Sequence, residues 1–193
     1  IHENKGVELD SKFYRRLAYD EILSNLLVLS QVRKRIKQTK KISKKFVDNI
    51  EKKIMDNIKF TLTKNQLDII KEINEDLKSN FRMFRLLQGD VGTGKTIVSL
   101  LSAANVIKSG WQVALMAPTE ILATQHYNLS KKIFGQTNIN IKLLTGNTES
   151  KNKKNIHEDL QNGKINLLIG THALFQKKII FKKLGFVIID EQH

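Results

Sequence analysis

The stretch that decides the fold is Gly89-Asp90-Val91-Gly92-Thr93-Gly94-Lys95-Thr96. It fits the pattern G-x-x-x-x-G-K-[ST], and it stands between an apolar run and a helix-like stretch, as that pattern requires. Glycines let the backbone curl so that successive N–H groups point at phosphate oxygens, and the N-terminus of the following helix adds partial positive charge. Lys95 would neutralise the charge of the β- and γ-phosphates, and the Thr96 hydroxyl could bind Mg²⁺. The stretch therefore predicts a nucleotide-binding P-loop rather than an ordinary glycine-rich turn.

Short apolar runs alternate with helical patterns around this P-loop. The candidate strands are Phe84–Gln88, Gln112–Ala117, Ile139–Leu144, Asn166–Gly170 and Phe186–Asp190. The candidate helices are Lys95–Ser109, Thr119–Phe134 and Glu149–Asn162. Strands that alternate with helices and are apolar along most of their length are typical of a parallel sheet covered on both faces. The prediction is an α/β fold with a doubly wound parallel sheet.

The chain before the sheet has a helical pattern. Apolar residues recur at spacings of three and four from Tyr14 to Leu29, which indicates an amphipathic helix. The predicted helices cover residues 11–38, residues 46–58, and Asn65–Asn80 with Thr63 as the cap. The predicted domains are a mostly helical linker over residues 1–59 and the sheet domain over residues 60–193.

The composition favours a polyanionic partner. The formal charge is +14, from 33 basic and 19 acidic residues, and residues 31–59 hold eleven of the basic and three of the acidic ones. Clustered cations release counterions from phosphate backbones, although a global lysine bias would produce part of this excess. The chain has no cysteine, which excludes disulfides and zinc–thiolate sites. The apolar runs are far shorter than the roughly 20 residues of a membrane span, and the sequence shows no signal-peptide pattern. We therefore expect a cytoplasmic protein and no membrane partner.

Two carboxylates follow the last apolar run. Asp190 and Glu191 come directly after the predicted strand, where one carboxylate can hold Mg²⁺ and the next can orient or deprotonate water. Asp190 is therefore the candidate metal ligand and Glu191 the candidate catalytic base. No histidine pair has the spacing of a metal site, and His126 and His157 are interpreted as surface or packing residues.

Three other predicted strands end in small or hydroxyl-bearing residues. The residues are Pro118-Thr119, Thr145-Gly146 and Gly170-Thr171-His172. Each is a routine turn when taken alone. Because the carboxyl ends of parallel strands share one edge of the sheet, together with the P-loop they form a row suited to a sugar–phosphate backbone.

These segments, in this order, resemble the motifs of superfamily-two helicases of the DEAD/DEAH-like kind. The matching segments are Phe60–Thr63 with Gln66, Gly89–Thr96, Ala117–Ala123, Leu144–Gly146, Gly170–His172 and Asp190–His193. Within the superfamily, Leu86–Gly92, Met116–His126 and His172–Gln176 are most similar to the RecG type, an ATP-dependent DNA branch-migration translocase. The stretch Arg16–Glu21 is similar to the RecG segment that joins the DNA-wedge domain to the motor.

The resemblance implies a RecA-like motor lobe that uses ATP and Mg²⁺ on branched DNA and stalled replication forks in recombination and repair. It assigns adenine recognition to Gln66, assisted by Phe60, and phosphate binding to Gly89–Thr96. It assigns coupling between the nucleotide and the DNA to His193. The implied contacts with the DNA backbone are Pro118, Thr119, Gly146, Thr171 and His172.

The chain also departs from the RecG pattern. That type carries a wedge domain before this region and a second RecA-like lobe with an arginine finger after it, so we expect a fragment that ends in the first lobe, with a separately encoded second lobe as a candidate partner. Alternatives are a non-catalytic ATP- or nucleic-acid-binding remnant of a truncated or split gene, and a P-loop kinase. The kinase is disfavoured because no arginine follows Lys95. Whether the chain turns over ATP alone is left open, and little turnover is expected.

Overall fold

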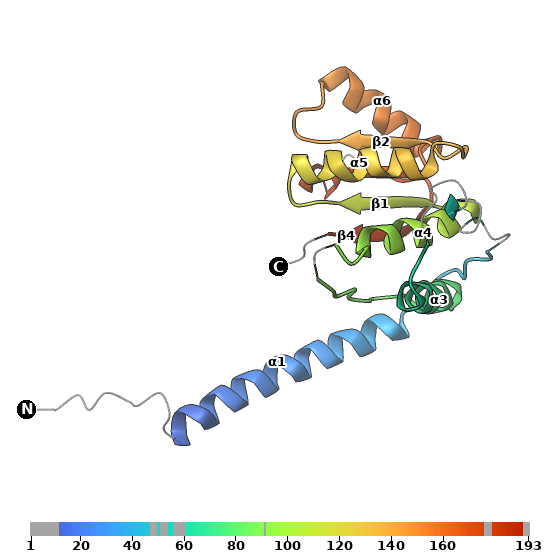
Figure 1. The fold of residues 1–193 in the computed structure, drawn as a ribbon. Coiled ribbons are helices and arrows are strands. Elements are labelled where there is room, and N and C mark those ends of the chain that lie inside the picture. The colour runs from blue at the N-terminus through green and yellow to red at the C-terminus, as the bar shows by residue number, and fades with distance from the viewer. Residues whose placement is uncertain are drawn as a thin grey trace, which may run out of the picture. The chain divides into compact units, whose positions relative to one another are not determined.

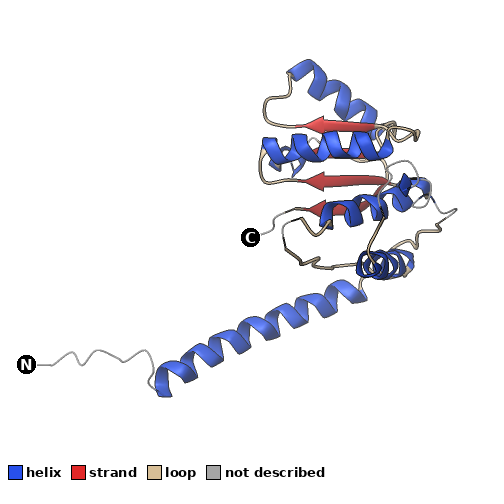
Figure 2. Cartoon of the chain, viewed as in Figure 1, coloured by secondary structure: helices blue, strands red, loops and turns tan. Residues whose placement is uncertain are grey.

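The computed structural model of the chain describes residues 12–46, 50, 54–55, 61–90, 92–175 and 179–190. Helices, strands and loops alternate after the P-loop, as Figure 1 and Figure 2 show. In chain order the elements are α1 (Lys12–Gln38), α3 (Lys64–Lys78), α4 (Lys95–Lys108), β1 (Gln112–Met116), α5 (Glu120–Phe134), β2 (Ile141–Leu144), α6 (Ser150–Gln161), β3 (Leu167–Gly170), the 3₁₀ helix η1 (His172–Phe175) and β4 (Leu184–Ile189). No helix of the described residues is both long enough and apolar enough to span a bilayer.

The chain forms two compact units. One contains the described part of residues 1–42 together with residues 80–85, and the other contains the described parts of residues 43–79 and 86–193. The domain boundary predicted near residue 59 stays a prediction, since residues 56–60 lie outside the described part of the chain.

The second unit is built on a parallel sheet with the strand order β2-β3-β1-β4. In register, Leu115 of β1 lies opposite Ile169 of β3 on one side and Ile188 of β4 on the other. The connection from β1 through α5 to β2 and the connection from β2 through α6 to β3 run in opposite directions along the sheet. Because parallel crossovers are right-handed, α5 and α6 cover opposite faces. This arrangement confirms the predicted α/β class.

Close packing of β2 against β3 requires a glycine at the end of β3. A Cβ atom on Gly170 would lie 2.1 Å from the carbonyl oxygen of Leu144, which is far inside van der Waals contact. Beside this pair, Ile156, Leu160 and Leu168 form part of a buried apolar cluster between α6 and the sheet. Gly170, which the sequence predicts at a strand end, is thus also required for packing.

A buried glutamine at the start of β1 joins the end of α6 to the segments that enter β3 and β4. Gln112 is 4% exposed, and its Nε2 donates to the carbonyl oxygens of Leu160 at 3.0 Å and Ile165 at 2.8 Å. Its Oε1 accepts from the N–H of Lys183 at 2.9 Å. Buried polar groups are stable only when they are paired, and this side chain satisfies backbone groups at the entries of β3 and β4. The polar start of β1 therefore fixes the edge opposite to the candidate site.

Helix α3 begins with a capping box and packs against α4. The Thr63 hydroxyl accepts from the N–H of Gln66 at 3.3 Å, while the Gln66 Oε1 accepts from the N–H of Thr63 at 2.9 Å. The buried face carries Ile70, Ile73 and Leu77. This confirms the predicted cap and the predicted helix. Of the helix predicted over residues 46–58, the structure describes only 46, 50, 54 and 55, and both Ile50 and Ile54 are buried.

The first unit consists of α1 and a short antiparallel contact. Lys40 bridges Phe81, the N–H of Lys41 donates to Asn80, and the N–H of Arg82 donates to Thr39. The helix predicted over residues 11–38 is confirmed as α1. The large apolar side chains that the structure describes on this helix are exposed, for example Leu17 at 67% and Leu26 at 58%.

One predicted strand is wrong. Phe84–Gln88 has no strand structure, and Phe84 and Leu86 are exposed at 61% and 73%. A strand forms only where a neighbouring strand takes up its hydrogen bonds. In the described sheet β4 pairs with β1 alone, and no described strand pairs with this run. Apart from the helix predicted over residues 46–58, most of which lies outside the described residues, the other predicted strands and helices occur with bounds that shift by up to two residues.

Candidate functional site

The P-loop precedes α4 in the conformation that the glycines permit. Gly92 and Gly94 both have a φ of +83°, in the left-handed region that residues with a Cβ rarely adopt. Gly94 is the N-cap of α4, and its carbonyl accepts the first helical bond from the N–H of Val98 at 3.1 Å. The first N–H groups of α4 have no partner within the helix, which makes this end suitable for an anion. Val91 lies outside the described residues.

Lys95 folds back over the loop that precedes it. Its Nζ donates to the carbonyl oxygens of Gly89 at 2.6 Å and Asp90 at 2.8 Å. The Thr93 hydroxyl also donates to Asp90 at 2.8 Å, which tightens the turn. Phosphate oxygens form stronger, charge-assisted bonds with an ammonium group than carbonyl oxygens do. The Lys95 ammonium therefore lies against the loop, where a phosphate group could replace the Gly89 and Asp90 carbonyls as its hydrogen-bond partner.

Gln66 connects the N-terminus of α3 to the P-loop. Besides its part in the capping box, its Nε2 donates to the carbonyl oxygen of Thr93 at 2.9 Å. A Cβ atom on Gly94 would lie 2.5 Å from this nitrogen, so the glycine also makes room for the contact. The amide keeps one hydrogen and one lone pair for a further partner. Phe60, the other predicted adenine residue, lies outside the described residues.

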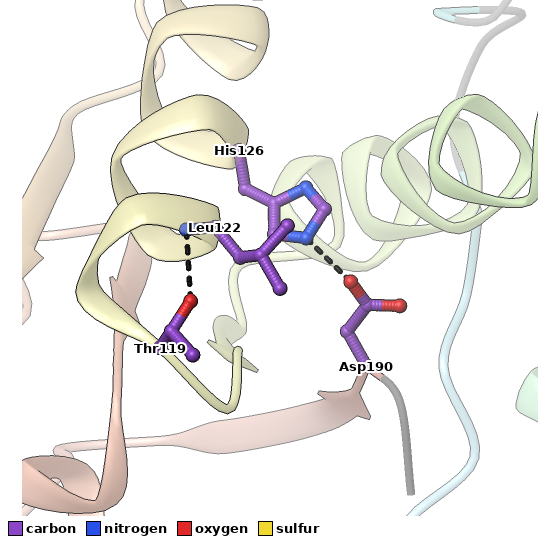
Figure 3. Close-up of polar contacts among 4 residues, drawn as sticks. All are labelled: Thr119, Leu122, His126 and Asp190. Atoms are coloured by element: carbon purple, nitrogen blue, oxygen red, sulfur yellow. Dashed lines mark hydrogen bonds and ion pairs between the residues drawn. The ribbon is translucent and has the colours of Figure 1, made fainter.

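Asp190 stands at the carboxyl end of β4. Its N–H donates to the carbonyl oxygen of Met116 at 2.9 Å, which extends the pairing of β4 with β1. Its Oδ2 accepts from Nε2 of His126 at 2.6 Å, with the two side chains 32% and 10% exposed (Figure 3). Glu191 and His193, the predicted base and coupling residue, lie outside the described residues.

The interpretation of His126 as a surface or packing residue misses this contact. The side chain is buried on the face of α5 that also carries Ala123, Ser130 and Ile133. A titratable group on an otherwise apolar or small-residue face requires a partner, and this pattern is the signal in the sequence that could have found it. The partner itself is 64 residues away, so no local spacing identifies it.

The predicted DNA-contact residues follow the carboxyl ends of β1, β2 and β3, and we call Pro118, Thr119, Gly146, Thr171 and His172 the strand-end row. Backbone pairing of Ala117 with Gly170 at 2.9 Å joins two of these ends. Glu120 joins the third, because its Oε2 accepts from Nδ2 of Asn147 at 2.6 Å and its Oε1 from the N–H at 3.3 Å. Thr119, Gly146 and His172 are exposed.

The P-loop and Asp190 belong to the same edge of the sheet. Helix α4 packs against β1 and β4, and three residues separate its end from the start of β1, so its first turn lies towards the opposite, carboxyl edge. Asp190 and the Thr96 hydroxyl offer the hard oxygen ligands that Mg²⁺ prefers. Asp190 Oδ1 has no hydrogen-bond partner among the described residues. These residues fit a nucleotide with its magnesium ion.

A P-loop before a helix, with an aspartate at the end of a nearby parallel strand, defines a P-loop nucleotide-binding lobe. A sequence model of the DEAD/DEAH box helicase family matches residues 63–193. The chain therefore belongs to the DEAD/DEAH box helicase family.

Several relatives match most or all of the chain. It is 45% identical to the ATP-dependent DNA helicase RecG of Aquifex aeolicus (strain VF5), and the match covers 100% of this chain and 25% of the relative. It is 42% identical to RecG of Borreliella burgdorferi (strain ATCC 35210 / DSM 4680 / CIP 102532 / B31), and the match covers 100% of this chain and 28% of the relative. The chain thus spans about a quarter of the length of the curated relatives it matches.

Solved structures agree with this similarity. A structure of RecG bound to a three-way DNA junction superposes with a TM-score of 0.84 at 42% identity, over 93% of this chain and 25% of that one. A hypothetical ATP-dependent RNA helicase from Sulfolobus tokodaii matches with a TM-score of 0.54 at 18% identity, over 72% of this chain and 40% of that one. The second likeness concerns the fold alone.

Proposed function

We propose that the chain is the ATP-binding first motor lobe of a RecG-like DNA helicase or translocase. The observation that carries this proposal is the P-loop with Asp190 at the same edge of a parallel sheet, in a chain similar to RecG along its whole length. The three-way junction in the related structure supports branched DNA, including stalled replication forks, as the substrate in recombination and repair. We propose the bacterial cytoplasm as its location, because ATP and chromosomal DNA meet there.

The P-loop would bind the phosphates of ATP. Backbone N–H groups of the loop and of the first turn of α4 would donate to phosphate oxygens, and Lys95 would leave the Gly89 and Asp90 carbonyls to neutralise phosphate charge. Gln66 would keep its bond to Thr93 and use the second hydrogen and lone pair of its amide for adenine. Base recognition and phosphate binding would thus share one hydrogen-bonded unit.

Asp190 and Thr96 would hold Mg²⁺ through their oxygen atoms. The bound ion would supply charge neutralisation for the β- and γ-phosphates. Glu191 follows Asp190 directly and would orient or deprotonate the attacking water, and His193 would report the state of the nucleotide to the DNA-binding residues. The strand-end row would contact the DNA backbone through hydroxyl and N–H groups. A second lobe, in the same or another polypeptide, would close over the nucleotide from the opposite side.

Nucleotide titration tests the proposal. Fluorescent ATP should bind the chain in the presence of Mg²⁺ more tightly than fluorescent GTP. Lys95→Ala should weaken both by about tenfold or more, equal to about 1.4 kcal/mol, because it removes phosphate charge and spares base recognition. Lys108→Ala, at the exposed far end of the same helix, is the matched control and should bind like the wild type. Equal affinities for ATP and GTP would remove the role of Gln66, and no binding at all would overturn the proposal.

A further inference from the structure

His126 and Asp190 form a short contact between α5 and the end of β4. A carboxylate only accepts hydrogen bonds, so Nε2 of His126 carries the hydrogen and donates it to Oδ2 at 2.6 Å. The imidazole is 10% exposed, so water competes poorly for it. Hydrogen bonds to an ionised group in a partly buried site are among the stronger ones in proteins.

This contact fixes the orientation of the Asp190 carboxylate. The backbone of Asp190 is held by Met116, and the imidazole engages one of its two oxygens. Figure 3 shows the second oxygen directed away from His126. An unrestrained carboxylate would rotate among several rotamers, whereas in this one a single oxygen is left without a partner among the described residues. Groups that orient a metal ligand in this way commonly change metal affinity by about 10- to 100-fold.

The helix that carries His126, α5, begins after its N-cap Thr119, a residue of the strand-end row. Thr119 caps α5 by accepting from the N–H of Leu122 at 3.3 Å, and Thr119 belongs to the strand-end row. From Thr119 to His126 a helix rises by about 10 Å, at 1.5 Å per residue. Because an α-helix moves as a rigid rod over such a length, a shift at its first turn displaces the imidazole. The bond between Glu120 and Asn147 links the Asn147 loop to this first turn as well.

We propose that His126 is a positioning residue that couples the strand-end row to the metal site through α5. It acts on Asp190 and touches neither nucleotide nor DNA. DNA on the row and Mg²⁺ at Asp190 bias the same hydrogen bond, so each changes the affinity for the other, as linkage requires. The inference rests on the proposed function, because it needs Asp190 as a magnesium ligand and the row as a DNA contact.

The test is the Mg²⁺ dependence of fluorescent ATP binding by the full chain, with and without a forked DNA. Three substitutions separate the hydrogen bond from packing. His126→Phe fills the space without a donor, His126→Gln supplies an N–H donor, and His126→Ala removes both. His157→Ala, on α6, is the matched control.

The midpoint is the Mg²⁺ concentration at which half of the Mg²⁺-dependent ATP binding is reached. Wild type and His157→Ala should have the same midpoint, and forked DNA should shift it in both. His126→Phe and His126→Ala should raise the midpoint by about tenfold and abolish the shift by DNA. His126→Gln should restore both at least in part. Nucleotide binding in EDTA should not change, which a general loss of structure would not allow.

Two results overturn the inference. One is a wild-type Mg²⁺ midpoint in His126→Phe, and the other is equal behaviour of the Phe and Gln variants. If His126→Ala does not fold, this pair still decides. Absence of Mg²⁺-dependent binding in the wild type would overturn the proposed function itself, and the inference would fall with it.

Discussion

Gly94 combines two constraints at a single residue of the P-loop. Its φ of +83° lies in the left-handed region, and its missing Cβ leaves space for the Gln66 amide. A Cβ at this position would raise the backbone energy in the first case and would clash with the Gln66 amide in the second. Gly110, between α4 and β1, has the first constraint without the second, since its φ is +79° and a Cβ there would meet nothing within 4 Å.

This difference gives a controlled prediction. Gly94→Ala and Gly110→Ala should each lower the free energy of unfolding by about 1 kcal/mol, because both force a Cβ into the left-handed region. Only Gly94→Ala should also weaken ATP binding, since it displaces Gln66 from Thr93. Urea denaturation measures the first effect and nucleotide titration the second. Equal ATP affinities in the two variants would show that the Gln66 contact does not support the nucleotide site.

At this scale the sequence predicts a residue well when its function is local. The neighbours of Lys95 and Asp190 in the chain predict their roles, and the structure places Lys95 over the loop before α4 and Asp190 at the end of β4. Their binding of phosphate and Mg²⁺ stays a prediction. His126 was not assigned, because its role depends on a residue 64 positions away. The roles of Phe60, Glu191 and His193 stay predictions, since those residues lie outside the described part of the chain.

At the scale of elements, hydrophobic periodicity predicts a helix better than it predicts a strand. Helix α3 is specified by its own cap and its own apolar face, so Thr63 and the spacing of Ile70, Ile73 and Leu77 are sufficient. A strand also depends on its neighbours. Phe84–Gln88 has the apolar pattern of a strand, but no described strand pairs with it, and it remains irregular.

Gln112 shows how one side chain holds several elements. Gln112→Leu should keep the volume but leave the N–H of Lys183 and the carbonyls of Leu160 and Ile165 without this partner. Gly163 and Lys182 still donate to the Leu160 carbonyl at 3.1 and 3.4 Å, so the loss falls on Ile165 and Lys183. An unsatisfied group costs about 1 to 3 kcal/mol, so we expect the free energy of unfolding to fall by about 2 to 3 kcal/mol. Urea denaturation measures it, with exposed Gln125→Leu on α5 as the control. A loss as small as that of the control would mean that water or other groups replace these bonds.

At the scale of the whole molecule, the excess positive charge predicts weak, salt-sensitive binding to DNA of any sequence. Arg33, Lys34 and Arg35 are exposed on α1. Changing all three to Gln should lower the affinity for forked DNA equally for two unrelated sequences. It should reduce the slope of log affinity against log salt by up to about 2.7, at roughly 0.9 per phosphate contact.

Fluorescence anisotropy at several salt concentrations measures both quantities. Lys151→Gln with Lys154→Gln, two changes on α6, is the control for loss of charge elsewhere. An unchanged slope in the α1 variant would mean that lysines outside α1 supply the electrostatic contacts. Binding that does not depend on salt, or that prefers one sequence strongly, would contradict a backbone contact altogether.

We expect catalytic turnover to require the whole motor rather than the nucleotide site alone. All six arginines lie at or before position 85, so an arginine finger cannot come from the part of this chain that follows the P-loop. Such a finger stabilises charge on the transferring phosphoryl group and contributes about 10³ to 10⁵ in rate. We therefore predict that the 193-residue chain binds ATP but hydrolyses it close to the background rate.

Phosphate release, measured with and without forked DNA, tests this prediction. Glu191→Gln should leave the already low rate nearly unchanged, because the base can accelerate only a reaction whose transition-state charge is also stabilised. Adding a separately expressed second lobe should raise the rate of the wild type if the two parts associate, and it should not raise the rate of Glu191→Gln. DNA-stimulated hydrolysis by the chain alone, abolished by Glu191→Gln, would instead mean that these residues form a complete catalytic unit. The source of the stabilising charge would then have to be sought among the arginines before the P-loop, with Arg82 and Arg85 the first to be substituted.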